Sequence, residues 1–178
     1  MQKKLMNIFF MAVTVALITA GTASAENSLK KNSKALSFGL IDSGIEVSGR
    51  MFVQDDVAVL GGVGLARSDN DESTLDYAVS AGMRKYLKKA DLAPFVGGVL
   101  SYSRDEFVVG APPATDVKSE KTLEISGVFG AEYFFAKQAS VEAQVGVGIA
   151  DTKNVAGSDS DETTIGTFSS GVTLNIYF

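Results

Sequence analysis

The sequence predicts an all-β fold, an eight-stranded antiparallel up-and-down transmembrane β-barrel. Two features lead to this fold: an apolar leader at the N-terminus and a two-residue alternation over residues 167–178. In that segment the apolar parity consists of Phe168, Val172, Leu174, Ile176 and Phe178. The residues of the other parity are polar or small, as expected for a strand with one apolar and one polar face. The alternation recurs along the chain, and only a closed sheet of such strands can span a bilayer.

The leader has the three parts of a secretory signal peptide. Lys3 and Lys4 form a basic start, residues 8–20 are apolar apart from two threonines, and residues 23–25 read Ala-Ser-Ala. We therefore expect a cleaved signal peptide at residues 1–25 and a mature barrel domain at residues 26–178. The alternative is a transmembrane anchor, but the apolar stretch is short against the ~20 residues that a spanning helix needs.

Composition limits what the mature chain can do. Without its 25-residue leader the chain has 153 residues, which is enough for one domain. This part carries 14 basic and 21 acidic residues, a formal charge of −7, so no basic patch is available for nucleic acid. The chain contains no cysteine, which excludes disulfide bonds and a lipid-modified N-terminal cysteine.

Eight segments carry the period-two pattern, and most are near the ~9–11 residues that a tilted membrane strand needs. They are Ala35–Ile41, Ile45–Val53, Val57–Arg67, Leu75–Tyr86, Pro94–Ser103, Leu123–Phe134, Ala139–Ala150 and Thr167–Phe178. We expect short periplasmic turns between them. Longer polar loops are expected on the outer side, at residues 67–74, 104–121 and 151–165.

The alternation separates charged from apolar side chains. Arg50 and Arg84 both lie on the polar parity of their strands. An arginine on the lipid face at the bilayer midplane costs ~2–4 kcal/mol, so the polar face is expected to line the lumen. A soluble lipocalin-like barrel with its apolar face inside has the same alternation and is the alternative fold. The leader, the aliphatic face and the glycine-rich polar face favour the membrane barrel.

Aromatic residues gather at the predicted strand ends, as in the interfacial girdles of membrane barrels. The periplasmic girdle is expected to comprise Phe52, Tyr86, Phe95, Tyr133, Phe135 and Phe178. The outer girdle is expected to comprise Tyr77, Tyr102 and Phe168.

Three parts of the chain together resemble the small eight-stranded outer-membrane barrels of the OmpA-like and OmpX-like group. They are the Ala-Ser-Ala end of the leader, the strand Pro94–Tyr102 with the sequence PFVGGVLSY, and the C-terminal NIYF. The resemblance implies an outer-membrane location, contact with outer-membrane lipid, and insertion by the barrel assembly machinery. Tyr177 and Phe178 would then belong to the assembly signal. We see no peptidoglycan-binding domain after the last strand, so the wall-tethering role of full-length OmpA is not expected.

Four charged residues of the polar face are expected to meet in the lower lumen. They lie toward the periplasmic ends of their strands and are Arg50, Arg84, Glu132 and Glu142. The interior of an eight-stranded barrel is just wide enough for side chains to fill, so these residues would form a charged plug. The functional alternative is a gated ion path that opens when ion pairs exchange partners.

Three acidic residues share the inward parity higher in the lumen and have no evident basic partner: Glu46, Asp76 and Glu124. They offer a site for a cation, although solvation at an open mouth accounts for them more simply. The acidic run at residues 159–162 is interpreted as a solvated loop tip. We expect no resident metal and no cofactor.

Catalysis is not expected. Enzymes among the small outer-membrane barrels resemble one another in using histidine as general base, a side chain that titrates near neutral pH. This chain contains no histidine and no cysteine. Its lysines after the leader fall in predicted turns and loops, apart from Lys85, which has the outward parity at the end of its strand, so a Ser–Lys pair with an inward-facing serine is not expected either.

The longest predicted loop is the leading candidate for a contact surface. It carries apolar and stiff residues: Phe107, Val108, Val109, Pro112 and Pro113. Exposed apolar residues mark interaction sites. The alternative is that the segment extends the preceding strand into a protruding hairpin, whose free edge accepts a partner strand. We expect a monomer with a structural or adhesion-like role toward an extracellular or host surface. A narrow ion-conducting pore and a soluble carrier are the alternative functions.

Overall fold

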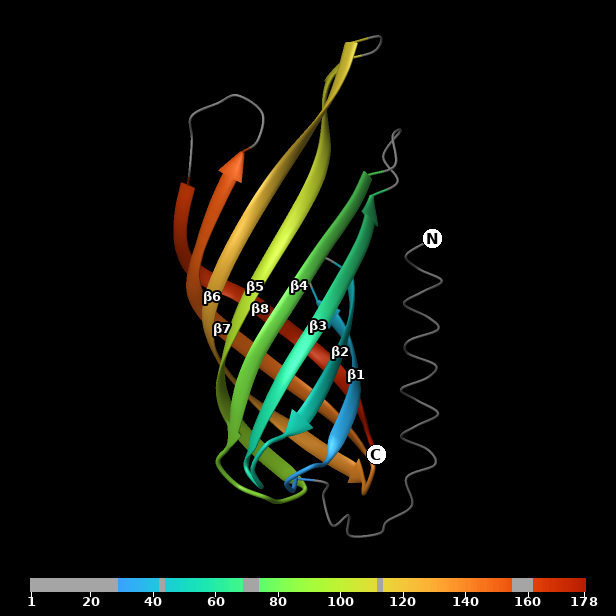
Figure 1. The fold of residues 1–178 in the computed structure, drawn as a ribbon, viewed down its shortest axis with the longest axis vertical. Coiled ribbons are helices and arrows are strands. Elements are labelled where there is room, and N and C mark those ends of the chain that lie inside the picture. The colour runs from blue at the N-terminus through green and yellow to red at the C-terminus, as the bar shows by residue number, and fades with distance from the viewer. Residues whose placement is uncertain (1–28, 42–43, 69–73, 112–113, 155–161) are drawn as a thin grey trace.

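The protein is a closed eight-stranded β-barrel in the computed structural model, as Figure 1 shows. The structure describes residues 29–41, 44–68, 74–111, 114–154 and 162–178. Its strands are β1 (Lys34–Ile41), β2 (Gly44–Phe52), β3 (Val57–Ser68), β4 (Thr74–Tyr86), β5 (Leu92–Ala111), β6 (Ala114–Ala136), β7 (Ala139–Asn154) and β8 (Glu162–Tyr177). The described residues contain no helix long and apolar enough to cross a membrane. The leader, residues 1–25, lies outside the described residues.

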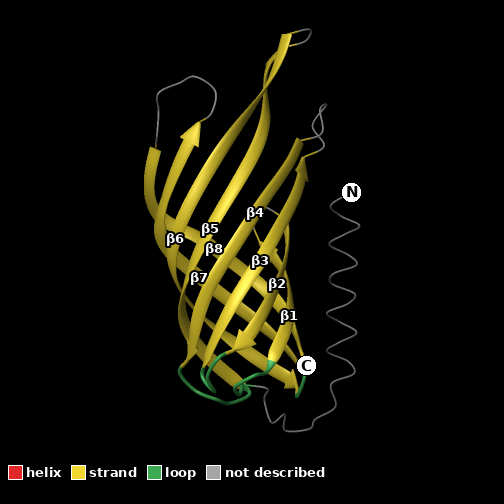
Figure 2. Ribbon diagram, viewed as in Figure 1, coloured by secondary structure: helices red, strands yellow, loops and turns green. Residues whose placement is uncertain are grey.

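Each strand pairs antiparallel with the next one in the chain, and β1 pairs with β8 to close the barrel. The closing seam runs from Ala35 opposite Tyr177 to Ile41 opposite Gly171. Figure 2 shows the described strands wound into one tilted wall, with short turns at its lower end. The predicted up-and-down topology is confirmed, because every neighbour in the sheet is also a neighbour in sequence.

The apolar parity of the strands faces outward. Val63 on β3 is 54% exposed and Ile125 on β6 is 63% exposed, whereas Glu132 on β6 is fully buried. In water this arrangement would expose a continuous aliphatic surface, which soluble monomers avoid. In a bilayer the same surface contacts hydrocarbon and every backbone group is paired within the closed sheet. The soluble barrel with an apolar interior is therefore wrong for this chain.

Glycines on the lumenal face make room for large side chains on adjacent strands. A methyl group added at Gly97 would lie 3.2 Å from both Cα and Cγ of Arg84 and would also meet the backbone of Met83. At Gly62 it would meet the carboxylate of Glu46 and lie 2.8 Å from the Ser80 hydroxyl. The glycine-rich polar face is thus complementary to the charged residues that share it.

The upper ends of the strands differ from the sequence-based expectation. β5 and β6 continue as a paired hairpin through most of residues 104–121, which we expected to be a loop (Figure 1). In β8 the register shifts, because Thr167 pairs with Val147 while Ser169 pairs with Gly146. The simple alternation that we assigned from Phe168 to Phe178 therefore breaks at Phe168, since a bulge inserts one extra residue into a strand.

The lower end of the lumen is closed by an apolar cluster rather than left open. Three aromatics that we assigned to the lipid interface, Phe52, Tyr86 and Phe95, are buried inside the barrel, so this part of the girdle prediction is wrong. These three residues form an aromatic seal across the lower lumen, with ring centroids 5.5 Å apart for Phe52 and Tyr86 and 5.7 Å apart for Tyr86 and Phe95. Leu29 folds back from the N-terminal side and is buried in the same cluster. Phe178, by contrast, is 73% exposed at the outer surface.

Candidate functional site

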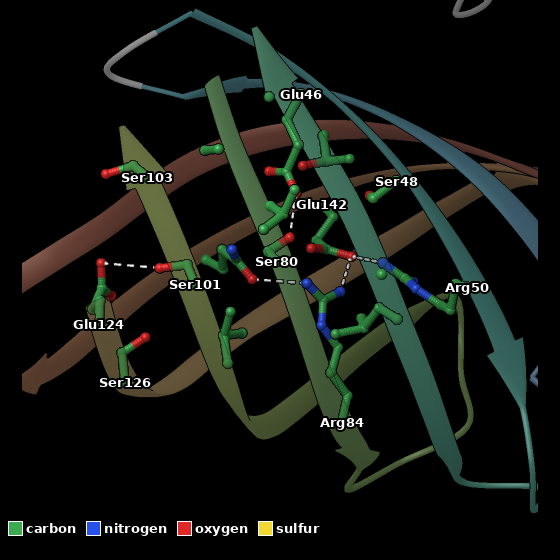
Figure 3. A pocket seen from close by; sticks show the side chains of 18 of the residues that line it. Glu46, Ser48, Arg50, Ser80, Arg84, Ser101, Ser103, Glu124, Ser126 and Glu142 are labelled. Atoms are coloured by element: carbon green, nitrogen blue, oxygen red, sulfur yellow. Dashed lines mark hydrogen bonds and ion pairs between the residues drawn. The ribbon is translucent and has the colours of Figure 1, made fainter. Parts of the chain in front are cut away.

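The lower lumen holds a charged cluster, defined here as Arg50, Arg84, Glu132 and Glu142. These residues come from β2, β4, β6 and β7, each close to the strand end that meets a short turn. All four have the inward-facing parity, and closure of the barrel brings them together across the lumen. Figure 3 shows three of them, with both arginines directed at the Glu142 carboxylate.

Arg50 connects the two glutamates. Its Nη1 donates to Oε2 of Glu132 at 2.9 Å, and its Nη2 donates to Oε2 of Glu142 at 2.7 Å. Nη1 also lies 2.7 Å from the Tyr86 hydroxyl and 3.0 Å from the Tyr177 hydroxyl. Hydrogen bonds between ionised groups are stronger than neutral ones, so the guanidinium is held firmly despite its burial.

Glu132 accepts hydrogen bonds from five side chains. Besides Arg50, the hydroxyls of Tyr86 and Tyr177 donate to it at 2.5 Å and 2.7 Å. The Asn175 amide donates to its Oε1 at 3.0 Å, and the Ser140 hydroxyl donates to the same oxygen. The carboxylate is fully buried, and these donors replace the water that it loses.

Arg84, on β4, is the fourth member of the charged cluster. Its Nη1 donates to Oε2 of Glu142 at 2.5 Å, and its Nη2 donates to Oε1 of Gln144 at 2.8 Å. The guanidinium carbon lies 4.4 Å from the centroid of the Phe95 ring, a cation–π contact. The aromatic seal below the charged cluster therefore also contacts one of its charges.

Two arginines and two glutamates balance one another, so the charged cluster is neutral overall. The side chains of Arg50 and Glu132 are 2% and 0% exposed, which leaves no room for solvent to replace a lost partner. Removing one member of a buried ion pair typically costs ~3–5 kcal/mol, because the remaining charge is left unpaired. The cluster and the aromatic seal together block the lower lumen in this structure.

Above the charged cluster lies a lumenal cavity of about 330 Å³. The cavity floor is formed by Arg50, Arg84 and Glu142, and Glu46 and Glu124 stand in its walls (Figure 3). Small hydroxyl side chains dominate the remaining polar lining: Ser48, Ser80, Ser101, Ser103, Ser126, Ser170 and Thr173.

The three upper acidic residues do not form one group. Glu46 accepts a hydrogen bond from Ser80 at 3.1 Å, and Glu124 accepts one from Ser101 at 3.5 Å. Asp76 instead accepts from the backbone amide of Glu106 at 2.9 Å, outside the cavity lining. Within the described part of the chain, no three acidic, histidine or cysteine side chains are placed to hold a metal ion.

Three of the five predicted outer-loop contact residues lie in the upper part of the β5–β6 hairpin. The backbone of Phe107, Val108 and Val109 is part of β5, paired with Lys118, Val117 and Asp116. The side chains of these three residues, and Pro112 and Pro113 altogether, lie outside the described residues.

Sequence reasoning missed several partners of the charged cluster: Tyr86, Ser140, Gln144, Asn175 and Tyr177. All have the inward parity, which was the available signal. Tyr177 was assigned only to the assembly signal, and in the structure its hydroxyl bonds to Glu132. Parity identifies which residues face the lumen but not the height at which residues of distant strands meet.

Comparison with solved structures identifies the architecture. The N-terminal β-barrel domain of Pseudomonas aeruginosa OprF is similar over 83% of this chain and 98% of its own, with 14% identity and a TM-score of 0.53. Neisserial surface protein A is similar over 82% of this chain and 94% of its own, with 12% identity and a TM-score of 0.51. The fold is that of the eight-stranded outer-membrane barrels. At these identities the likeness concerns the fold alone. No protein-family model matches the chain. No curated protein matches it significantly.

Proposed function

We propose that this protein is a monomeric outer-membrane barrel that presents its β5–β6 hairpin as a surface for interaction with an extracellular or host partner. The observation that carries the proposal is the length of this hairpin. The last described pair between β4 and β5 is Tyr77 with Arg104, and the last between β6 and β7 is Glu120 with Asn154. Beyond these pairs β5 and β6 continue together as a two-stranded ribbon to Ala111 opposite Ala114.

Such a ribbon has two unpaired edges among the described strands, and unpaired edges accept partner strands. A second source of support is the lower lumen, where buried ion pairs and packed aromatic rings leave the barrel as a rigid support for the hairpin. The same plug disfavours the ion-pore alternative, because conduction would require buried pairs to separate.

The location and assembly of the protein belong to the same proposal. The aliphatic exterior suits outer-membrane lipid, the leader suits export with cleavage after Ala25, and the C-terminal aromatic suits the barrel assembly machinery. No step of this role needs a cofactor or catalysis.

The test compares the full chain with a trimmed variant on the cell surface. Asp105 and Glu120 are opposite one another, so an Asn-Gly turn can replace residues 106–119 and reconnect the strands. We expect cells with the full chain to adhere to host cells or matrix, and cells with the trimmed variant to lose that adhesion. Lys89→Ala, in a turn at the opposite end of the barrel, is the control and should adhere normally. Equal adhesion by the trimmed variant and the full chain would contradict the proposal.

A further inference from the structure

The lumenal cavity carries an excess of negative charge. The two arginines on its floor are already matched by Glu132 and Glu142. Among the described residues that line the cavity, these arginines are the only basic ones, so Glu46 and Glu124 add two negative charges without an ionic partner. Among the described residues, Glu46 accepts a hydrogen bond only from the Ser80 hydroxyl, and Glu124 only from the Ser101 hydroxyl.

A second observation points to a missing hydrogen-bond donor at the cavity floor. Both arginines bind the same oxygen of Glu142, Oε2. The other oxygen, Oε1, is buried in a residue only 1% exposed and accepts no hydrogen bond from the described residues. Glu142 lines the cavity, and Figure 3 shows its carboxylate among the other lining side chains, bonded to Arg50 and Arg84. A buried carboxylate oxygen without a donor is costly, and a ligand N–H would satisfy it.

One wall of the cavity is apolar. Leu60 and Val99 both line it, and their side chains converge over Gly82, where an added methyl would lie 2.5 Å from Leu60 Cδ1 and 3.2 Å from Val99 Cγ2. Leu60 and Val99 are the largest apolar side chains of inward parity among the residues that line the cavity. A ligand that fits the cavity therefore has a hydrocarbon part as well as positive charge.

We propose that the cavity binds a small linear aliphatic diamine. Its two ammonium groups match the two unpaired negative charges of Glu46 and Glu124, and one of their N–H groups reaches Oε1 of Glu142. Its methylene chain lies against Leu60 and Val99. Ligand sites usually measure ~300–1,000 Å³, so a cavity of about 330 Å³ suits a small molecule. A bare metal ion suits it less, because the carboxylates are spread over the walls and floor. This inference concerns the lumen and is independent of the proposed hairpin function.

Calorimetry on the refolded full chain in detergent tests the proposal, with diaminobutane as the probe. We expect saturable binding, and roughly tenfold or more weaker binding by Glu46→Gln/Glu124→Gln, since hydrogen bonds to charged groups are the strong ones. Asp56→Asn/Glu162→Gln is the matched control: it removes the same charge outside the cavity and should bind as the parent does. No binding by the parent chain, or equal loss in both double variants, would overturn the proposal.

A second measurement needs no variant and guards against misfolding of the Glu46/Glu124 substitution. Butylamine and magnesium ions are titrated into the parent chain under the same conditions. We expect both to bind roughly tenfold or more weakly than diaminobutane, because each lacks either the second ammonium or the apolar stem. If butylamine or magnesium bound with the same affinity as diaminobutane, the cavity would not select a diamine, and the proposal would be overturned.

Discussion

At the scale of single residues, Glu132 shows why the lumen requires a charge at this position. Five side chains donate to its carboxylate, and one of them is a buried arginine. A neutral residue of the same size would keep the packing but leave Arg50 with half of its ionic partners. The alternating pattern of β6 does not reveal this role, because Glu124 has the same parity but accepts only one hydrogen bond from the described residues.

We expect Glu132→Ala to destabilise the barrel by ~3–5 kcal/mol, since it leaves the buried Arg50 charge short of a partner. Urea unfolding of the protein refolded in lipid vesicles measures this. Asp56→Ala is the control: it removes an exposed pair with Lys85, 4.0 Å apart, and should cost only ~0–1 kcal/mol. If the two variants unfold at the same urea concentration, the charged cluster does not stabilise the fold.

A second residue-scale prediction concerns pH. Asp55, in the turn after β2, accepts a hydrogen bond from the Lys31 amide at 2.9 Å and lies 3.5 Å from Nζ of Lys89. Both contacts lower the pKa of its carboxyl from the ordinary 3.8. The pKa of the Asp55 carboxyl is lower in the folded protein than in the unfolded chain. The stabilising contact is therefore fully present above the unfolded pKa and is lost as the pH falls through the folded pKa. The amide shift of Lys31 in an NMR titration should therefore have its midpoint below 3.8. A midpoint at or above that value, or an unchanged Lys31 amide in Asp55→Asn, would count against the contact.

At the scale of elements, each strand satisfies two environments at once. Its outward residues contact hydrocarbon and its inward residues build the charged cluster or line the cavity, so a strand cannot slip by one residue without exchanging the two faces. The bulge at Phe168 is the exception, since it allows β8 to change parity once near its upper end.

The lipid-facing register predicts a depth-dependent cost for charge. Val63 lies in the middle of β3 and is 54% exposed. Replacing it with arginine should lower the free energy of unfolding from a bilayer by ~2–4 kcal/mol. Leu87 is also exposed but lies in the turn after β4. Replacing it with arginine at the membrane interface should lower the free energy of unfolding by only ~0–1 kcal/mol. Unfolding from vesicles measures both substitutions. Equal costs at the two positions would argue against a bilayer around the barrel.

At the scale of the whole molecule, the barrel and the hairpin are separate in their contacts. The closed sheet, the charged cluster and the aromatic seal lie below the last pairs of β4 with β5 and of β6 with β7. Among the described residues, the ribbon above those pairs is bonded within itself, apart from the Glu106 amide bonded to Asp76. The contacts that stabilise the barrel and the hairpin proposed for surface interaction therefore lie in different parts of the molecule.

Replacing residues 106–119 with an Asn-Gly turn should therefore leave barrel stability nearly unchanged. We expect the trimmed variant to keep the compact, fast-migrating form on unboiled gels and to lose it at the same temperature as the parent. Glu132→Ala serves as the positive control and should lose that form at a lower temperature. A trimmed variant that unfolds as early as Glu132→Ala would show that the hairpin supports the barrel.

From the sequence, alternation determined the topology, and together with the leader and the cost of charge in hydrocarbon it determined the lumenal face of each strand and the four members of the charged cluster. These follow from local chemistry, since a strand exposes alternate side chains and a charge avoids hydrocarbon. Only the tertiary structure decided which charges pair, because Arg50 meets Glu132 across 82 positions of sequence through the tilt and register of the closed barrel. It also decided that Phe52, Tyr86 and Phe95 seal the lumen: an aromatic at a strand end suits either an interface or an interior, and barrel closure over Leu29 buried these three.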